Sequence, residues 1–203
     1  MEEKVKYFNY LEKERLERIF YKQPQEFDKK TDKDILKYAL GAFLYIPANK
    51  YEQIYKSVVN QEKEAKPLAI CLEDAISEFG EREAIENLKL VLDDLSKQVF
   101  CKLEKLPLIF IRVKNKEQLK KIKDILIKNK DFITGIIIPK ADSELLEDFI
   151  SILDNFNLNN LYIIPIIESS KFIYKEIKET QFQKMYYSIL NHKERILGIR
   201  IGL

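Results

Sequence analysis

The chain has 203 residues, of which 46% are hydrophobic and 33% are charged, and its formal net charge is +2. This composition is typical of a folded globular protein and excludes a disordered chain, and the length allows one full hydrophobic core. Acidic and basic residues are mixed along the chain, so there is no basic field, which argues against nucleic acid as a partner. The most basic region, 114–130, intersperses its lysines with apolar residues at helical spacing, which indicates the solvent face of an amphipathic helix.

Cysteine usage and the N-terminus indicate the compartment. Cys71 and Cys101 form no CxxC pair, and we expect both to be reduced, with Cys71 buried in a strand. The chain is charged from residue 2, which does not fit a signal peptide, and its apolar runs are too short to cross a bilayer. The sequence therefore predicts a cytoplasmic protein with no membrane partner.

Residues 1–40 are expected to form a helical extension ahead of the main domain. Apolar side chains recur at roughly the helical period through 4–20, which predicts a helix. Pro24 marks a break, and Asp32 or Asp34 is placed to cap a short helix that follows. The extension could cover the bottom of the main domain or lie against an open edge of it, and the sequence leaves both arrangements open.

From residue 41 to residue 203 the pattern changes to apolar runs of strand length that alternate with amphipathic helices. Six strands are predicted, at 42–48, 68–74, 106–113, 133–140, 161–169 and 195–202. The helices predicted between them cover 50–65, 81–99, 116–129, 143–155 and most of 171–191. Strands that are apolar on both faces and separated by helices predict a parallel sheet covered by helices.

Two parallel α/β architectures fit this pattern: an open doubly wound sheet and a (β/α)8 barrel. No GxGxxG follows the first strand, so a dinucleotide-binding fold is unsupported. A barrel would need eight strands, two more than the pattern supplies. We therefore predict an α/β fold of the (β/α)8 TIM-barrel type, present as about six βα units, with C-terminal units expected beyond the end of the sequence.

Polar and charged residues follow the predicted strands, at the edge where parallel α/β folds build their sites. Asn49 follows the first strand, Glu73 and Asp74 the second, Arg112 the third, Lys140 the fourth and Glu168 the fifth. If the strands curl into a barrel, these side chains converge at one rim. Taken singly, each acid could instead cap a helix or pair with a neighbour, but their joint occurrence favours a site. The lone histidine, His192, is expected at the surface.

This set of residue types suits metal-assisted enolate chemistry. A carboxylate such as Glu168 can hold Mg²⁺, which prefers oxygen ligands and keeps several waters. The ion can stabilise an enolate that forms when a C–C bond breaks or a proton leaves. Arg112 can bind a substrate carboxylate or the enolate oxygen. Glu73 and Asp74 can accept hydrogen bonds from metal-bound waters, and either could act as a base.

Five segments resemble, in order, motifs of the citrate lyase beta subunit and HpcH/HpaI aldolase superfamily. They are FLYIPANKYEQIYKSV, ICLEDAI, IRVKN, GIIIPKAD and PIIES, and the likeness covers about residues 43–203. The branch that it resembles is the citrate-lyase-like C–C bond lyases of bacterial stress-response operons. The resemblance implies a TIM barrel, Mg²⁺, homo-oligomers, and aldol or Claisen-type cleavage or condensation of oxo acids or acyl-CoA thioesters.

By position, the resemblance also assigns roles to individual residues. Glu168 is similar to the family's first metal carboxylate, and Arg112 to its substrate-binding arginine. Glu73 and Asp74 resemble the acidic pair beside the metal waters, while Asn49 and Lys140 are assigned to substrate binding. The family's second metal ligand is an aspartate just after the sixth strand. Here the segment GIRIGL ends at that turn, so this ligand is expected beyond Leu203 and the 203-residue form is expected to bind Mg²⁺ weakly.

The sequence departs from the family pattern at several positions. Ala48 replaces a glycine, Cys71 replaces an aspartate, Lys114 is an extra residue, and no histidine base lies near the second strand. Two hypotheses remain. The first is a Mg²⁺-dependent carbon–carbon lyase or aldolase, incomplete in this chain. The alternative is a non-catalytic, degenerate barrel that serves as a binding or assembly subunit.

Overall fold

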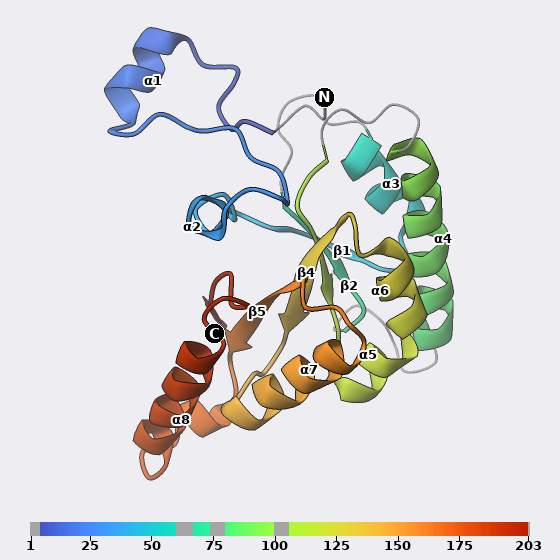
Figure 1. Ribbon diagram of the computed structural model, residues 1–203, viewed down its shortest axis with the longest axis vertical. Coiled ribbons are helices and arrows are strands. Elements are labelled where there is room, and N and C mark those ends of the chain that lie inside the picture. The colour runs from blue at the N-terminus through green and yellow to red at the C-terminus, as the bar shows by residue number, and fades with distance from the viewer. Residues whose placement is uncertain (1–4, 60–66, 74–79, 100–105, 203) are drawn as a thin grey trace.

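The computed structural model describes residues 5–59, 67–73, 80–99 and 106–202 (Figure 1). In these residues a single parallel sheet has the strand order β1-β2-β3-β4-β5-β6, so each strand pairs with the next one along the chain. The strands are β1 (Leu44–Pro47), β2 (Leu68–Cys71), β3 (Ile109–Arg112), β4 (Ile133–Ile138), β5 (Tyr162–Ile167) and β6 (Arg200–Ile201). The sheet curls into a half-barrel, which confirms the partial (β/α) barrel and excludes the doubly wound order.

Helices precede the sheet and connect its strands. They are α1 (Lys13–Ile19), α2 (Lys33–Leu36), α3 (Tyr51–Val59), α4 (Glu81–Val99), α5 (Lys116–Lys121), α6 (Lys123–Asn129), α7 (Ser143–Asn155), the 3-10 helix η2 (Ser170–Phe172) and α8 (Lys178–Asn191). The single helix predicted over 116–129 is divided at Ile122, whose backbone (φ −95°, ψ 8°) interrupts the α-helical geometry. No helix in the described ranges is long and apolar enough to cross a membrane.

The larger hydrophobic core lies between the outer face of the sheet and the helices that follow its strands. Ile70, Ile111 and Ile136 of the sheet are fully buried there. Leu88 of α4 and Phe149 of α7 pack against the same core. Because side chains alternate along a strand, the residues between these isoleucines point to the opposite, inner face of the half-barrel.

A second core fills that inner face. Phe110, Ile137 and Ile164 of the strands are buried together with Phe27 and Leu36, which precede the sheet in the chain. The N-terminal segment therefore covers part of the inner face, a matter that the sequence left open. α2 lies beside this face, whereas α1 projects away from the sheet (Figure 1).

The N-terminal segment is less helical than predicted. The helix expected over 4–20 begins only at Lys13, so the prediction was wrong for residues 5–12. Val5 instead pairs with Phe27 through two backbone hydrogen bonds of 2.8 Å. Tyr7 packs on the Phe27 ring at 4.9 Å between centroids, and Phe8 adopts a positive φ of 61°. The apolar spacing there reflects aromatic packing in a loop, not one face of a helix.

Candidate active site

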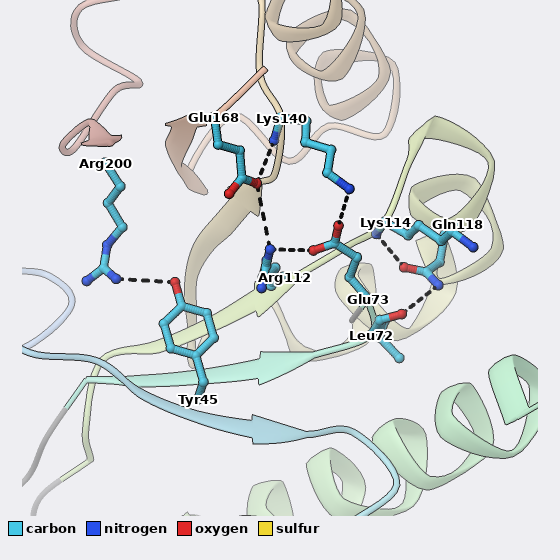
Figure 2. Close-up of polar contacts among 9 residues, drawn as sticks. All are labelled: Tyr45, Leu72, Glu73, Arg112, Lys114, Gln118, Lys140, Glu168 and Arg200. Carbon is cyan, nitrogen blue, oxygen red and sulfur yellow. Dashed lines mark hydrogen bonds and ion pairs between the residues drawn. The ribbon is translucent and has the colours of Figure 1, made fainter. Parts of the chain in front are cut away.

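Charged side chains gather on the inner face at the C-terminal ends of the strands (Figure 2). Arg112 ends β3, two residues after Phe110 of the inner core, so it points to the same face. Glu73 lies two residues after the end of β2, and Cys71 of that strand pairs in register with Arg112. Glu168 directly follows β5. Parallel pairing thus brings together residues that are far apart in the sequence.

Arg112 lies between two carboxylates. Its Nη2 is 2.5 Å from Glu73 Oε2 and 3.8 Å from Glu168 Oε1 (Figure 2). Lys140 Nζ lies 3.6 Å from Glu73 Oε1. The exposed fractions of the side chains rise from 7% for Glu73 and 12% for Arg112 to 20% for Glu168 and 68% for Lys140. The cluster therefore has a buried ion pair at its base and a carboxylate and an ammonium toward solvent.

The backbone around Glu168 fixes its carboxylate. Lys140 has a positive φ of 49°, and in this turn its backbone N–H donates to Glu168 Oε1 at 3.0 Å. Gly202 also lies against Glu168, because a Cβ on Gly202 would stand 2.5 Å from Glu168 Oε2 and 2.7 Å from its Cβ. Only glycine lets the chain after β6 approach this closely. Two backbone segments therefore contact this side chain and restrict its position.

Gln118 of α5 supports the cluster, and our sequence reasoning missed it. This side chain is 1% exposed, and its Oε1 accepts the Lys114 N–H at 2.7 Å. Its Nε2 donates to the Leu72 carbonyl at 3.1 Å, one residue before Glu73. A signal was present in the sequence, because Gln118 stands four residues before Ile122, on the buried face of the predicted helix.

Tyr45 and Arg200, from the first and last strands, were also missed. Arg200 Nη1 donates to the Tyr45 hydroxyl at 3.2 Å (Figure 2). The Arg200 guanidinium also lies 3.9 Å from the centre of the Phe43 ring. Arg200 interrupts an otherwise apolar run, which was the available signal. Its register partner Ile166 belongs to the inner core, so Arg200 shares the face that carries Arg112.

The remaining predicted residues lie elsewhere or outside the description. Asn49 is exposed in the turn after β1 and forms no hydrogen bond with the described members of the cluster. Asp74 and Cys101 lie outside the described residues, and Cys71 is buried in β2 as expected. His192 ends α8, with its Nε2 2.8 Å from Glu147 Oε2, away from the cluster.

The donor set offers oxygen ligands for a divalent cation. In the described part of the chain, no group of three or more His, Cys, Asp or Glu side chains could hold a metal ion. Mg²⁺, however, commonly takes one or two protein carboxylates and fills its other positions with waters and substrate oxygens. Glu168 and Glu73 face the same guanidinium, and Glu168 is the more exposed of the two. Glu168 therefore offers the type of oxygen ligand that Mg²⁺ prefers.

A sequentially ordered parallel half-barrel with charged residues at the C-terminal strand ends defines a protein of the TIM-barrel class. Residues 34–203 match the family model described as C-C bond lyase of the TIM-barrel fold, and the chain belongs to this family. A comparison with curated proteins gave no match.

Two solved structures share the fold of this chain at low sequence identity, and a third matches it less closely. Haloferax volcanii malate synthase in a lead(II) complex has a TM-score of 0.56 and 17% identity, over 79% of this chain and 49% of that one. Its pyruvate/acetyl-CoA ternary complex also gives 0.56 and 17%, over 79% and 46%. CitE from Mycobacterium tuberculosis, with magnesium, acetoacetate and coenzyme A, gives 0.45 and 15%, over 79% and 47%. The chain thus spans about half the length of these proteins.

Proposed function

We propose that this chain acts in a Mg²⁺-dependent carbon–carbon lyase or aldolase reaction on a 2-oxo acid or an acyl-CoA thioester. The observation that carries the proposal is the contact of Arg112 with both Glu73 and Glu168, in a chain of the C–C bond lyase family. Bond breaking next to a carbonyl leaves negative charge on the carbonyl oxygen. Fixed cations beside that oxygen lower the barrier because they need no reorganisation during the reaction.

The residues divide this work by exposure and charge. Glu168 would hold Mg²⁺, and Glu73 would accept hydrogen bonds from waters on the ion, with a second carboxylate ligand expected beyond Leu203. The ion would supply charge stabilisation at the substrate oxygen. Arg112 is held in place by the two carboxylates and binds the enolate oxygen or a substrate carboxylate. Lys140, which is 68% exposed, attracts the acidic substrate. Asp74 as a second acid beside Glu73, and Asn49 as a substrate contact, remain parts of the proposal.

Proton exchange next to the carbonyl tests this proposal without knowledge of the natural substrate. Pyruvate and acetyl-CoA are suitable probes, since the Haloferax volcanii malate synthase of the same fold was solved with both. In D₂O with Mg²⁺, NMR should detect deuterium entering the methyl group of one probe, and EDTA should stop the exchange. Glu168→Gln and Arg112→Gln should each slow the exchange by about 100-fold.

Arg82→Gln is the matched control, because Arg82 is 91% exposed on α4 and pairs only with its helix neighbour Glu86 in the described residues. Calorimetric titration with Mg²⁺ gives a second readout, in which Glu168→Gln should weaken binding and Arg82→Gln should not. Exchange that is absent in the unaltered protein, or unchanged by both site substitutions, would favour the alternative of a non-catalytic barrel that binds a partner.

A further inference from the structure

Arg200 has a fixed orientation on the inner face. Its guanidinium is stacked on Phe43 at 3.9 Å from the ring centre, and its Nη1 donates to Tyr45 at 3.2 Å. Phe43 in turn packs against Phe110 of the inner core, with 5.0 Å between ring centroids. A guanidinium that is stacked and hydrogen-bonded in this way loses little freedom when it binds an anion, which favours binding.

The charge of Arg200 is not balanced in the way that the charge of Arg112 is. Arg112 contacts Glu73 and Glu168, whereas Arg200 forms no ion pair with any Asp or Glu in the part of the chain that the structure describes. Its one polar partner there is the Tyr45 hydroxyl, a neutral group. That hydroxyl accepts from Arg200, so its own O–H can donate to a ligand. The pair therefore presents a cation and a hydroxyl donor on one side of the site.

The guanidinium groups of Arg112 and Arg200 both lie near the ring of Tyr45. The guanidinium carbons of Arg112 and Arg200 each lie 5.8 Å from the centre of the Tyr45 ring. The two guanidinium carbons are therefore no further apart than twice that distance, a span that a four-carbon dicarboxylate bound to both guanidiniums can cover. A ligand whose first anionic group meets Arg112 and Lys140 can place a second one against Arg200.

We propose that Arg200, supported by Phe43 and Tyr45, binds a second carboxylate of the substrate, so that the site prefers dicarboxylic acids to monocarboxylic acids. This inference rests on the proposed function for the identity of the reacting group but extends it to the substrate class. Guanidinium–carboxylate hydrogen bonds contribute enough for roughly tenfold or greater selectivity. Neither Arg200 nor Tyr45 is needed to hold Mg²⁺ in this scheme.

Calorimetry with simple anions tests the proposal. Succinate and butyrate have the same carbon chain and differ in one carboxylate, and inorganic phosphate represents the other common oxyanion. The unaltered protein should bind succinate at least tenfold more tightly than butyrate. Arg200→Gln should remove that preference, and Tyr45→Phe, which keeps the ring but loses the hydroxyl, should reduce it. Arg82→Gln, with the same chemical change at an exposed site, should leave it intact.

Several results would overturn the proposal. The first is that the unaltered protein and the folded Arg200→Gln variant bind succinate equally. The second is that the unaltered protein does not prefer succinate to butyrate. The third is that phosphate binding depends on Arg200 while succinate binding does not. Thermal unfolding verifies that each variant is folded. None of these probes requires Mg²⁺ or bond cleavage. Arg200-dependent succinate binding without Mg²⁺-dependent proton exchange would therefore reject the proposed function alone, and the reverse result would reject this inference alone.

Discussion

At the scale of single residues, the ion pair between Arg112 and Glu73 combines an energetic penalty with a precise orientation. Both side chains are largely removed from water, at 12% and 7% exposed, so their attraction is offset by lost hydration. Such a pair contributes little net stability compared with apolar residues of similar size. Substitution of only one of the two partners is costly, because the other charge stays buried with weaker compensation. The pair therefore mainly fixes the position of the guanidinium.

This asymmetry gives a quantitative prediction. Glu73→Gln should lower the free energy of unfolding by about 3 kcal/mol, since it leaves the Arg112 charge buried with weaker compensation. Arg112→Met should also destabilise the protein. The double variant should lose clearly less stability than the sum of the single losses, as measured by urea unfolding in a double-mutant cycle. Additive losses, within about 0.5 kcal/mol, would contradict the buried pairing.

The sequence supplied part of this cluster and not the rest, for a physical reason. Glu73, Arg112, Glu168 and Lys140 could be placed together because parallel strands end at one edge. Those four do lie together in the structure. Gln118 was missed because its role depends on the direction of one side chain. That side chain is buried, although it belongs to a lysine-rich region that the sequence indicated to be solvent-exposed. Strand patterns give positions along the sheet but not the side-chain contacts across its inner face.

At the scale of elements, the apolar runs identified every strand of the described sheet. They predicted too long a strand for β6, the last one in the sheet. The run at 195–202 predicts a full strand, whereas β6 contains only Arg200 and Ile201. Before it, Ile196 forms a lone parallel bridge with Ile163. Ile196 is buried, but Ile199 and Ile201 are 47% and 81% exposed, so the apolar run marks neither the buried part of this stretch nor the part that pairs with β5. Apolar residues alone therefore do not locate the hydrogen bonds of a strand.

Lys29 connects the N-terminal segment to the sheet and gives the second prediction. Its Nζ donates to the Ile133 carbonyl at 2.9 Å and to the Lys130 carbonyl at the end of α6. Burial lowers the pKa of Lys29 from 10.5 to about 8, although Asp131 opposes the shift. Between these two pH values the unfolded chain holds a proton that the folded chain has released. Stability from this group should therefore rise with pH across that window.

The measurement is urea unfolding of the unaltered protein and of Lys29→Met at several pH values from 8 to 10.5, the window that the pKa shift defines. The stability difference should move in favour of the unaltered protein as pH rises. Lys22→Met provides the control, because Lys22 is an exposed lysine of the same N-terminal segment and is not among the groups that shift the pKa of Lys29. Its substitution should give a flat difference. A flat or falling difference for Lys29→Met would contradict the lowered pKa.

At the scale of the whole molecule, the half-barrel has two hydrophobic cores. Its inner face carries the N-terminal cover at one end and the charged cluster at the other. Helices cover the outer face, and the N-terminal segment covers part of the inner one. Lys29 contacts the start of β4, whereas the charged cluster stands at the strand ends. The cover and the candidate site therefore occupy opposite ends of the same surface. This arrangement leaves the charged rim accessible while the apolar inner residues stay out of water.

If the N-terminal segment is an integral part of that core, its residues should stabilise strands that are distant in sequence. Leu36 is fully buried against the inner core, whereas Leu16, 9% exposed in α1, belongs to neither core. Leu36→Ala should lower the free energy of unfolding by about 3 kcal/mol, because it removes buried methyl groups and leaves a cavity. Leu36→Ala should also raise the rate of hydrogen exchange of the backbone amides in β4 and β5.

Leu16→Ala is the matched control, since it makes the same chemical change in the same segment but outside both cores. It should destabilise the protein much less and leave exchange in β4 and β5 unchanged. Mass-spectrometric hydrogen exchange on the three proteins separates these outcomes. If Leu36→Ala accelerated exchange only within residues 5–40, the segment would be a separable attachment, and the inner core would have to be complete without it.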